Sequence, residues 1–115
     1  MRIGVKSLAG ENCLTFESGE KVYELIFSQL RDGKAVHLDF EGVRIFASPF
    51  FNAAVGRLLK DFDSDTLNLL VKIENINPVG LHVLRQVIKN SSQYYRDLAL
   101  KQALDEVMKE QSEVN

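Results

Sequence analysis

The sequence predicts an α/β domain in which helices pack on a small mixed or parallel β-sheet. Segments with the two-residue period of strands alternate along the chain with segments of helical period. That alternation is typical of helices packed on a parallel or mixed sheet. Hydrophobic residues make up 45% of the 115 residues, which is enough for one core, so we expect a single domain over residues 1–115.

Composition excludes several classes of function. The net charge is -2 and the fourteen Lys and Arg are scattered, so no basic field would attract nucleic acid. Cys13 is the only cysteine, and no Cys/His cluster has the spacing of a zinc site. No signal peptide or membrane span is apparent in the sequence. We therefore expect a soluble, cytoplasmic protein that binds no metal, cofactor, membrane or nucleic acid.

The N-terminal third should contain two short extended segments and a helix. Residues 2–7 can form a first strand, which we expect at the edge of the sheet, because Ile3 and Val5 alternate with polar neighbours. Residues 13–16 can form a second extended piece. Helical spacing begins near Ser18, and Asp32-Gly33 should end that helix because glycine accepts the left-handed conformation common at helix ends.

Residues 34–40 should form the central strand of the sheet. Val36, Leu38 and Phe40 alternate with His37 and Asp39, which is the period of a pleated strand. This is the most consistently apolar strand, and helical segments flank it, as expected for the centre of such a sheet.

A second helix should begin at Ser48 and run to about residue 62. The Ser48 hydroxyl can accept a hydrogen bond from a free backbone N–H, and Pro49 suits the first helical position. Phe51, Val55 and Leu58 then recur at helical spacing, so one broad face should pack on the sheet.

The C-terminal half should contain a strand and two helices. Residues 63–65 suggest a turn, and residues 66–73 have the alternation of a strand. Asn77-Pro78 is a start signal for a third helix, which residues 90–92 should end or bend. The last helix should cover residues 96–111.

No pattern typical of an enzyme is present. The seven glycines form no phosphate-binding loop. A catalytic role for His37 would require a partner at the strand end, so we expect a packed or rim histidine there and a surface histidine at His82. Asp39 and Glu41 lie at the carboxyl end of the central strand, where α/β sheets place their sites. We expect these acids to shape the turn or contact a partner, although a metal or general-base role is an alternative.

Two aromatic pairs are candidate contact residues. Phe50-Phe51 lies at the start of the second helix, and Tyr94-Tyr95 lies near the predicted helix break. Adjacent helical residues point about a third of a turn apart, so only one ring of each pair needs to be buried. The favoured role is filling gaps between layers, while the alternative is a contact with a partner or a second copy of the chain.

The stretch VHLDFEGVRIFASPFFNAAVGRLLKDF, residues 36–62, is similar to the central strand, loop and helix of STAS domains, the sulfate transporter and anti-sigma factor antagonist fold. It most resembles the bacterial STAS-like domains of unassigned function, and the similarity covers most of the chain. The resemblance implies the topology of the anti-sigma factor antagonists. In those proteins, an Asp-Ser-Ser/Thr-Gly loop is phosphorylated at its first serine by a kinase that resembles histidine-kinase ATPases.

The resemblance places Ser48 at that phosphorylated position when Gly56-Arg57 is matched to the family's Gly-Arg. Ala47, Pro49 and Phe50 stand where the family has aspartate, the second hydroxyl residue and glycine. A phosphate on Ser48 would add about -1.5 to -2 charge at the helix start and repel an acidic partner.

The resulting hypothesis is a non-enzymatic signalling module in transcription regulation, whose partner is an ATPase or kinase of the anti-sigma factor type. Phosphorylation of Ser48 would control binding. The alternative is a small-ligand or nucleotide-binding domain that uses the strand ends near Asp39 and Glu41. A third hypothesis is a homodimer that uses the two aromatic pairs. The residues expected to contact the partner are Ala47, Ser48, Pro49, Phe50, Asn52, Asp39 and Glu41.

Overall fold

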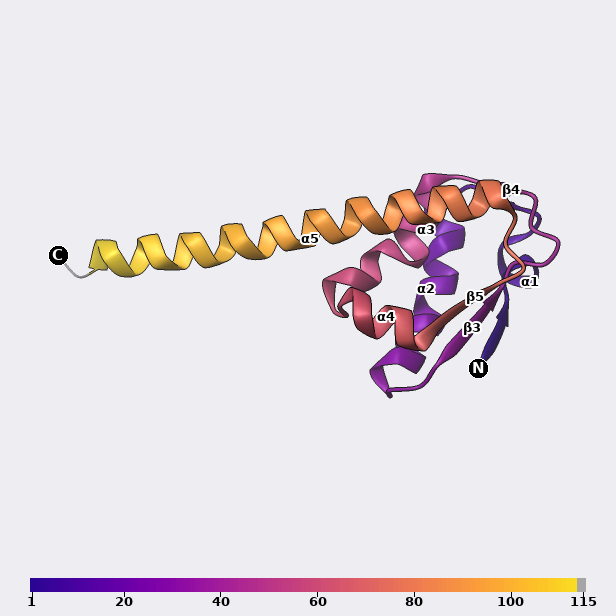
Figure 1. Cartoon of the computed structure of the whole chain (residues 1–115), viewed down its shortest axis with the longest axis horizontal. Coiled ribbons are helices and arrows are strands. Elements are labelled where there is room, and N and C mark those ends of the chain that lie inside the picture. The colour runs from indigo at the N-terminus through magenta and orange to yellow at the C-terminus, as the bar shows by residue number, and fades with distance from the viewer. Residues whose placement is uncertain (114–115) are drawn as a thin grey trace.

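A three-stranded parallel sheet forms one layer of the fold, with the helices packed on one of its faces (Figure 1). The fold is described from a computed structural model that covers the backbone of residues 1–113 and the side chains of residues 1–108. The strands are β1 (Arg2–Gly4), β3 (Val36–Asp39) and β5 (Val71–Glu74), in the order β1-β3-β5. Ile3, Leu38 and Ile73 lie side by side in the register. The predictions of a central strand within residues 34–40 and of an edge position for the first strand are confirmed.

The two faces of this sheet differ in chemistry. Val36 and Leu38 are fully buried, whereas His37 and Asp39 on the opposite face are partly exposed. The buried face belongs to the core together with Val22 and other apolar residues of the covering helices. The sheet is therefore covered by the core on one face and carries polar side chains on the other, as the alternation in residues 34–40 predicts.

The helix α2 (Phe16–Arg31) packs closely against α3 (Ser48–Ala54). Thr15 begins α2, because its hydroxyl accepts a hydrogen bond from the Ser18 amide at 3.1 Å. Gly33 follows its end with a φ of 73°, as predicted from Asp32-Gly33. At the contact between the two helices, Gly19 lies so close to the Phe50 carbonyl that a Cβ atom would come within 2.3 Å of it.

Two short elements near the N-terminus differ from the prediction. Residues 2–7 divide into β1 and a one-turn helix, α1 (Val5–Ala9). The predicted extended piece at residues 13–16 is β2 (Asn12–Cys13), which pairs in parallel with β4 (Ile45–Phe46) in a second, two-stranded sheet. The segment between the central strand and the helix that begins at Ser48 therefore contains a strand, and the chain reaches α3 directly from it.

The predicted helix over residues 48–62 is wrong in its second half. It is interrupted at Val55 (φ -124°) and continues as the 3₁₀-helix η1 (Gly56–Lys60). Both parts still bury their apolar side chains, and Leu58 is fully buried. The apolar spacing therefore predicted which side chains are buried but not the change in helix type, because it reports burial rather than the hydrogen-bonding pattern.

The predicted strand at residues 66–73 is also partly wrong. Its first half is the helix α4 (Ser64–Leu70), and only β5 is a strand. The Asp63 carboxylate accepts a hydrogen bond from the Thr66 amide at 2.7 Å, so Asp63 begins a helix and the predicted turn at residues 63–65 is its start. Capping overrides the alternating pattern of the leucines, of which Leu69 is exposed and Leu67 is buried.

The chain ends in one helix of 36 residues, α5 (Pro78–Glu113). Asn77 begins it as predicted, because its side-chain oxygen accepts a hydrogen bond from the Gly80 amide at 2.7 Å. The predicted break at residues 90–92 is wrong, and the predicted fourth helix is the continuation of α5. Ser91 lies against Gly56 of η1, a position that requires a small side chain, and the low helix propensity of serine costs only a few tenths of a kcal/mol.

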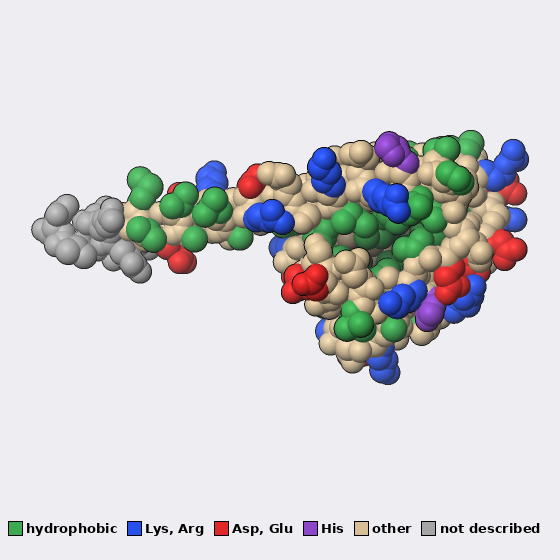
Figure 2. All heavy atoms as spheres, viewed as in Figure 1, with side chains coloured by type: hydrophobic (Ala, Val, Ile, Leu, Met, Phe, Trp, Pro, Cys, Tyr) green, Lys and Arg blue, Asp and Glu red, His purple; other side chains and the backbone are tan. Residues whose placement is uncertain are grey.

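The C-terminal half of α5 projects far beyond the rest of the domain (Figure 1). The molecule consequently measures 62 × 27 × 22 Å. On the body itself, an apolar groove opens between α5 and the α4-β5 segment, and Figure 2 shows it as a hollowed hydrophobic area. Its volume is about 130 Å³, and its lining includes Leu67, Ile73 and Ile88.

Candidate functional site

One face of α3 carries three of the sequence-predicted site residues that reach solvent. Ser48 and Asn52 are four residues apart, so they lie on the same face of the helix, and both are exposed. Pro49 is exposed beside them, and Ala47 is partly buried. Phe50 is a correction: it was predicted to contact a partner, but it is 0% exposed because it packs inward against Phe51 and α2.

The predicted capping role of Ser48 is also wrong. The residue that begins α3 is Ala47, whose backbone is extended and which makes no side-chain cap hydrogen bond. Ser48 is therefore the first helical residue, and Pro49 is the second, where the missing N–H of proline removes no intrahelical bond. The Ser48 hydroxyl is thus not used in holding the helix start and remains exposed.

An open cleft of about 590 Å³ begins beside Asn52. Its walls come from the start of α2, from α3 and η1, and from the middle of α5, so four separate segments of the chain meet there. We call it the α3 cleft, and its lining residues are Phe16, Asn52, Gly56, Arg57, Asn90, Ser91, Tyr94 and Tyr95.

Arg57 is positioned in this cleft by aromatic rings. Its guanidinium carbon lies 4.2 Å from the Tyr23 ring centroid and 5.7 Å from that of Phe16. Both distances are within the range of cation–π attraction. The cleft therefore offers a partner a fixed positive charge that is flanked by aromatic surface. Burial also raises the pKa of the Tyr23 hydroxyl, so it stays neutral near pH 7.

The aromatic pairs behave differently from each other. Phe50 and Phe51 are both fully buried, which confirms the favoured role of filling gaps between layers and leaves neither ring for the alternative contact with a partner or a second copy. Tyr94 is 61% exposed and lies edge-on to the partly buried Tyr95, with 5.0 Å between ring centroids. Tyr94 thus remains available for a contact.

Sequence reasoning did not identify Phe16 and Arg57. Phe16 is 44% exposed although it is a large apolar residue, because it follows the Thr15 cap on the outer side of the first turn of α2. The available signal was the capping pair of Thr15 and Ser18, which fixes where α2 begins. Arg57 lies in η1, whereas the aromatic rings around it lie in α2. No pattern within either segment predicts that the two elements meet.

Asp39 and Glu41 lie at a different place, the carboxyl end of the sheet. The Asp39 carboxylate accepts hydrogen bonds from Arg2 and Asn75, each at 2.9 Å, and from the Glu41 amide at 3.0 Å. It therefore ties β1 and the end of β5 to β3. Among the described residues, no hydrogen bond or ion pair connects this cluster to Ser48, and a ligand that used Asp39 would have to displace Arg2 and Asn75.

Glu74 extends this cluster on the polar face of the sheet. It pairs with Arg2, and its carboxylate accepts a hydrogen bond from His37 Nδ1 at 2.6 Å. The hydrogen bonds from His37 and then Arg2 lower the pKa of Glu74, and those from Asn75, the Glu41 amide and Arg2 lower that of Asp39. Both groups are thus held ionised as structural contacts between strands.

This cluster predicts a loss of stability in acid. A carboxyl whose folded-state pKa is below its unfolded value stabilises the fold above the unfolded value, and that contribution disappears as pH falls through the folded value. For Glu74 the loss begins below its ordinary pKa of 4.5. We expect Glu74→Gln to lower the thermal midpoint at pH 7 and to match the wild type near pH 3. A constant difference from pH 7 to pH 3 would contradict this origin.

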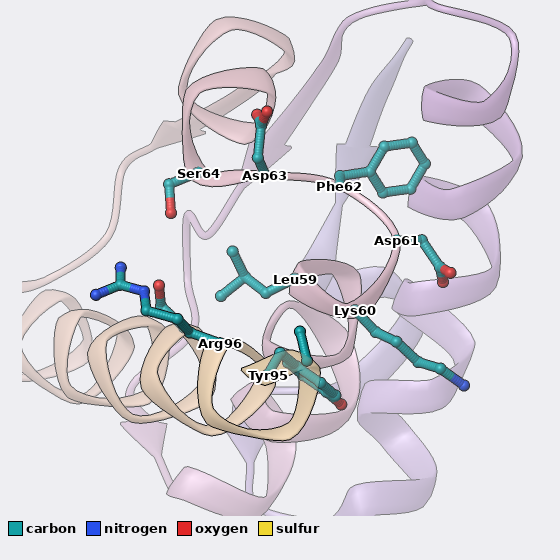
Figure 3. Close-up of a pocket in the computed structure, with 10 residues that line it drawn as sticks. Leu59, Lys60, Asp61, Phe62, Asp63, Ser64, Tyr95 and Arg96 are labelled. Carbon is teal, nitrogen blue, oxygen red and sulfur yellow. The ribbon is translucent and has the colours of Figure 1, made fainter. Parts of the chain in front are cut away.

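A second open cleft, of about 540 Å³, lies where α5 leaves the body (Figure 3). Asp63 and Ser64 line one side, and Tyr95 and Arg96 of α5 line the other. Elsewhere, His82 is exposed, and burial raises the pKa of the Cys13 thiol to about 11. Among the residues that the structure describes, no group of three or more His, Cys, Asp or Glu could hold a metal ion.

Comparison with known proteins gives one family. The model of a STAS-like domain of unknown function (DUF4325) matches residues 18–81, which is more than half of the chain. The matched region extends from the first turns of α2 to the start of α5 and contains the exposed face of α3. No curated protein and no solved structure gives a significant match. Within the described part of the chain, no helix has the length and apolar character that crossing a bilayer requires.

Proposed function

The chain belongs to the family of STAS-like domains of unknown function, and from this premise we propose that it is a non-enzymatic regulatory module that binds a protein partner. The proposed binding surface is the exposed face of α3 together with the adjoining α3 cleft. The partner class that the family resemblance favours is an ATPase or kinase of the anti-sigma factor type. Phosphorylation of Ser48 is the proposed control.

The observation that supports this surface most strongly is the setting of α3. The helix buries four of its seven residues and exposes Ser48, Pro49 and Asn52 on one side. That side continues into a cleft lined by Phe16, Arg57 and Tyr94. Tyrosine and arginine are enriched among the residues that contribute most to protein–protein affinity. An open cleft with aromatic walls and a fixed cation thus adjoins, at Asn52, the helix face that carries the candidate switch residue.

The composition of the cleft favours a protein partner over an independent catalytic reaction. Apart from Arg57, its polar side chains are the amides of Asn52 and Asn90 and the hydroxyls of Ser91, Tyr94 and Tyr95. These groups bind partners, and the described lining holds no His, Lys, Asp or Glu that would serve as the base of a nucleophile. Arg57 is held by the aromatic rings, and no carboxylate among the described residues forms an ion pair with it, so its charge can pair with an acidic group of the partner.

Ser48→Asp is expected to weaken the complex at least tenfold and to leave the thermal midpoint almost unchanged. A negative charge at the centre of the interface loses hydration without gaining a partner, whereas in the free protein the exposed side chain stays in water. Isothermal titration calorimetry against a purified ATPase of the anti-sigma factor type measures the affinity. Ser48→Ala should bind like the wild type.

Ser7→Asp is the matched control, because Ser7 is an exposed serine on α1, outside the proposed surface. It adds the same charge and should bind with wild-type affinity. Equal affinities for wild type, Ser48→Ala and Ser48→Asp would remove Ser48 from the mechanism. Incubation with the kinase and ATP, followed by mass spectrometry of the wild type and Ser48→Ala, tests the modification itself.

A further inference from the structure

The projecting half of α5 carries an apolar stripe that its own domain does not cover. We define the arm as residues 96–108 and the arm stripe as Leu100, Leu104, Val107 and Met108, with Ala103 between them. The four large side chains are between 50% and 67% exposed. Figure 2 shows hydrophobic side chains along this part of the helix. Clustered apolar side chains on a projecting helix are a common mark of an interaction surface.

The arm stripe lies on the side of α5 opposite to the one that packs on the body. Leu84 and Val87 are buried in the core, and Ser91 lies against Gly56. With about 100° of rotation per residue, Leu100, Leu104 and Val107 point roughly the other way. Beyond Leu98, the continuation of the body-facing side is instead polar, with Gln102 and Asp105. The arm stripe is therefore not an extension of the domain core.

The spacing of the arm stripe fits a second helix. Leu100, Leu104 and Val107 are separated by four and three residues, which is the alternation that places side chains along the seam of paired helices. Asp97, Lys101 and Asp105 lie on one flank of this seam, and Arg96 lies on the other. The charges beside the seam then decide which partner orientation is favourable.

These charges favour a second copy of the chain in antiparallel orientation. In a parallel pair, Arg96 of one copy and Lys101 of the other would meet across the seam, and two positive charges would repel each other. In an antiparallel pair, the flank that carries Lys101 and Asp105 in one copy faces the same flank of the other copy. Lys101 of each copy then approaches the flank that carries Asp105 of the other. The contact is then self-complementary, as a two-fold symmetric interface requires.

We propose that the arm stripe is a homodimer contact in which the α5 helices of two copies pair in antiparallel orientation. The contact is distinct from the α3 surface, so the proposal does not depend on the partner-binding function. The stripe is short, and its area is on the order of the smallest specific interfaces, so the dimer is weak and depends on concentration. The dimer would hold two α3 surfaces on one particle, which strengthens binding to a dimeric partner.

Sedimentation velocity of the full chain across micromolar to millimolar concentrations tests the contact. The apparent mass should rise from 13.0 kDa towards twice that value. Leu104→Glu should raise the dimer dissociation constant at least tenfold. Gln102→Glu adds the same charge on the body-facing side of the arm and should leave dimerisation unchanged, and circular dichroism checks that both variants keep their helix content.

A charge exchange tests the orientation. Lys101→Glu should weaken an antiparallel dimer several-fold, and Lys101→Glu combined with Asp105→Lys should restore it, because exposed charge pairs contribute only modestly. In a parallel dimer, Lys101→Glu would instead strengthen association by pairing with Arg96. That result would overturn the orientation. A chain that stays at 13.0 kDa up to millimolar concentration, or a dimer that Leu104→Glu leaves intact, would overturn the contact itself.

Discussion

Phe51→Ala is expected to destabilise the domain by about 3–5 kcal/mol, the usual cost of removing a buried aromatic ring. Phe51 is 0% exposed, and its ring centroid lies 5.4–5.9 Å from those of Phe40, Phe46 and Phe50. These residues come from the end of β3, from β4 and from α3. The substitution would therefore leave a cavity where the elements that position Ser48 meet.

Urea denaturation followed by circular dichroism measures this loss. Typical domain stabilities are about 5–15 kcal/mol, so the variant should lose much of its stability and can be partly unfolded at 37 °C. Phe16→Ala is the matched control, because Phe16 is 44% exposed and its removal should cost about 1 kcal/mol or less. A loss below about 1 kcal/mol for Phe51→Ala would show that this ring is not part of a packed core.

Gly19→Ala is expected to destabilise the domain by about 1–3 kcal/mol, the usual cost of overpacking a core. In an isolated helix the same change would stabilise by up to about 1 kcal/mol, because alanine is the better helix former. Here the new methyl group would lie 2.3 Å from the Phe50 carbonyl oxygen and 2.8 Å from the Ala53 Cβ. Backbone and Cβ atoms cannot rotate away, so α2 and α3 would have to separate.

Gly4→Ala provides the comparison for this substitution. Its new methyl group would meet only the Ser7 hydroxyl at 3.8 Å, an ordinary contact, and the backbone at Gly4 (φ -79°) is allowed for alanine. We expect almost no change in the urea midpoint. If Gly19→Ala were as stable as the wild type, the close packing of α2 on α3 would be contradicted, and the exposed face of α3 would lose its fixed position over the cleft.

Apolar periodicity predicted the central strand of the sheet correctly. Val36 and Leu38 alternate with polar residues, and they form the central strand of the observed sheet. The run of apolar residues from Phe51 to Leu58 is likewise buried. The order of the main elements and the STAS-like family followed from these segments, because burial of one face is the signal that a sequence displays most directly.

A local hydrogen bond and a tertiary contact lie where the prediction was wrong. Asp63 caps α4, so residues that alternate like a strand form a helix instead. This cap is a local signal, and the prediction gave more weight to the alternation. α5 continues through residues 90–92, which were predicted to end or bend it, and Ser91 packs there against Gly56 of η1. That contact depends on tertiary position, which a pattern within one segment cannot show.

The candidate site was predicted in part. Ser48, Pro49 and Asn52 are exposed as a surface site requires, whereas Phe50 is buried, and Asp39 is engaged with Arg2 and Asn75 elsewhere. The contribution of α2 and α5 to the cleft could not be predicted, because it arises from how these helices cross and not from their own sequences. Phosphorylation of Ser48 by a partner kinase stays a prediction.

The central claim is that a partner protein binds the exposed face of α3 and its cleft. Amide NMR spectra of the isotopically labelled chain, recorded while the purified ATPase is added, test it most directly. We predict that the perturbed amides cluster at Ser48, Asn52, Arg57 and Tyr94, and that Lys72 on the sheet is unaffected. Perturbations confined to the sheet around Asp39 and Glu74, or no perturbation at saturating partner, would contradict the claim.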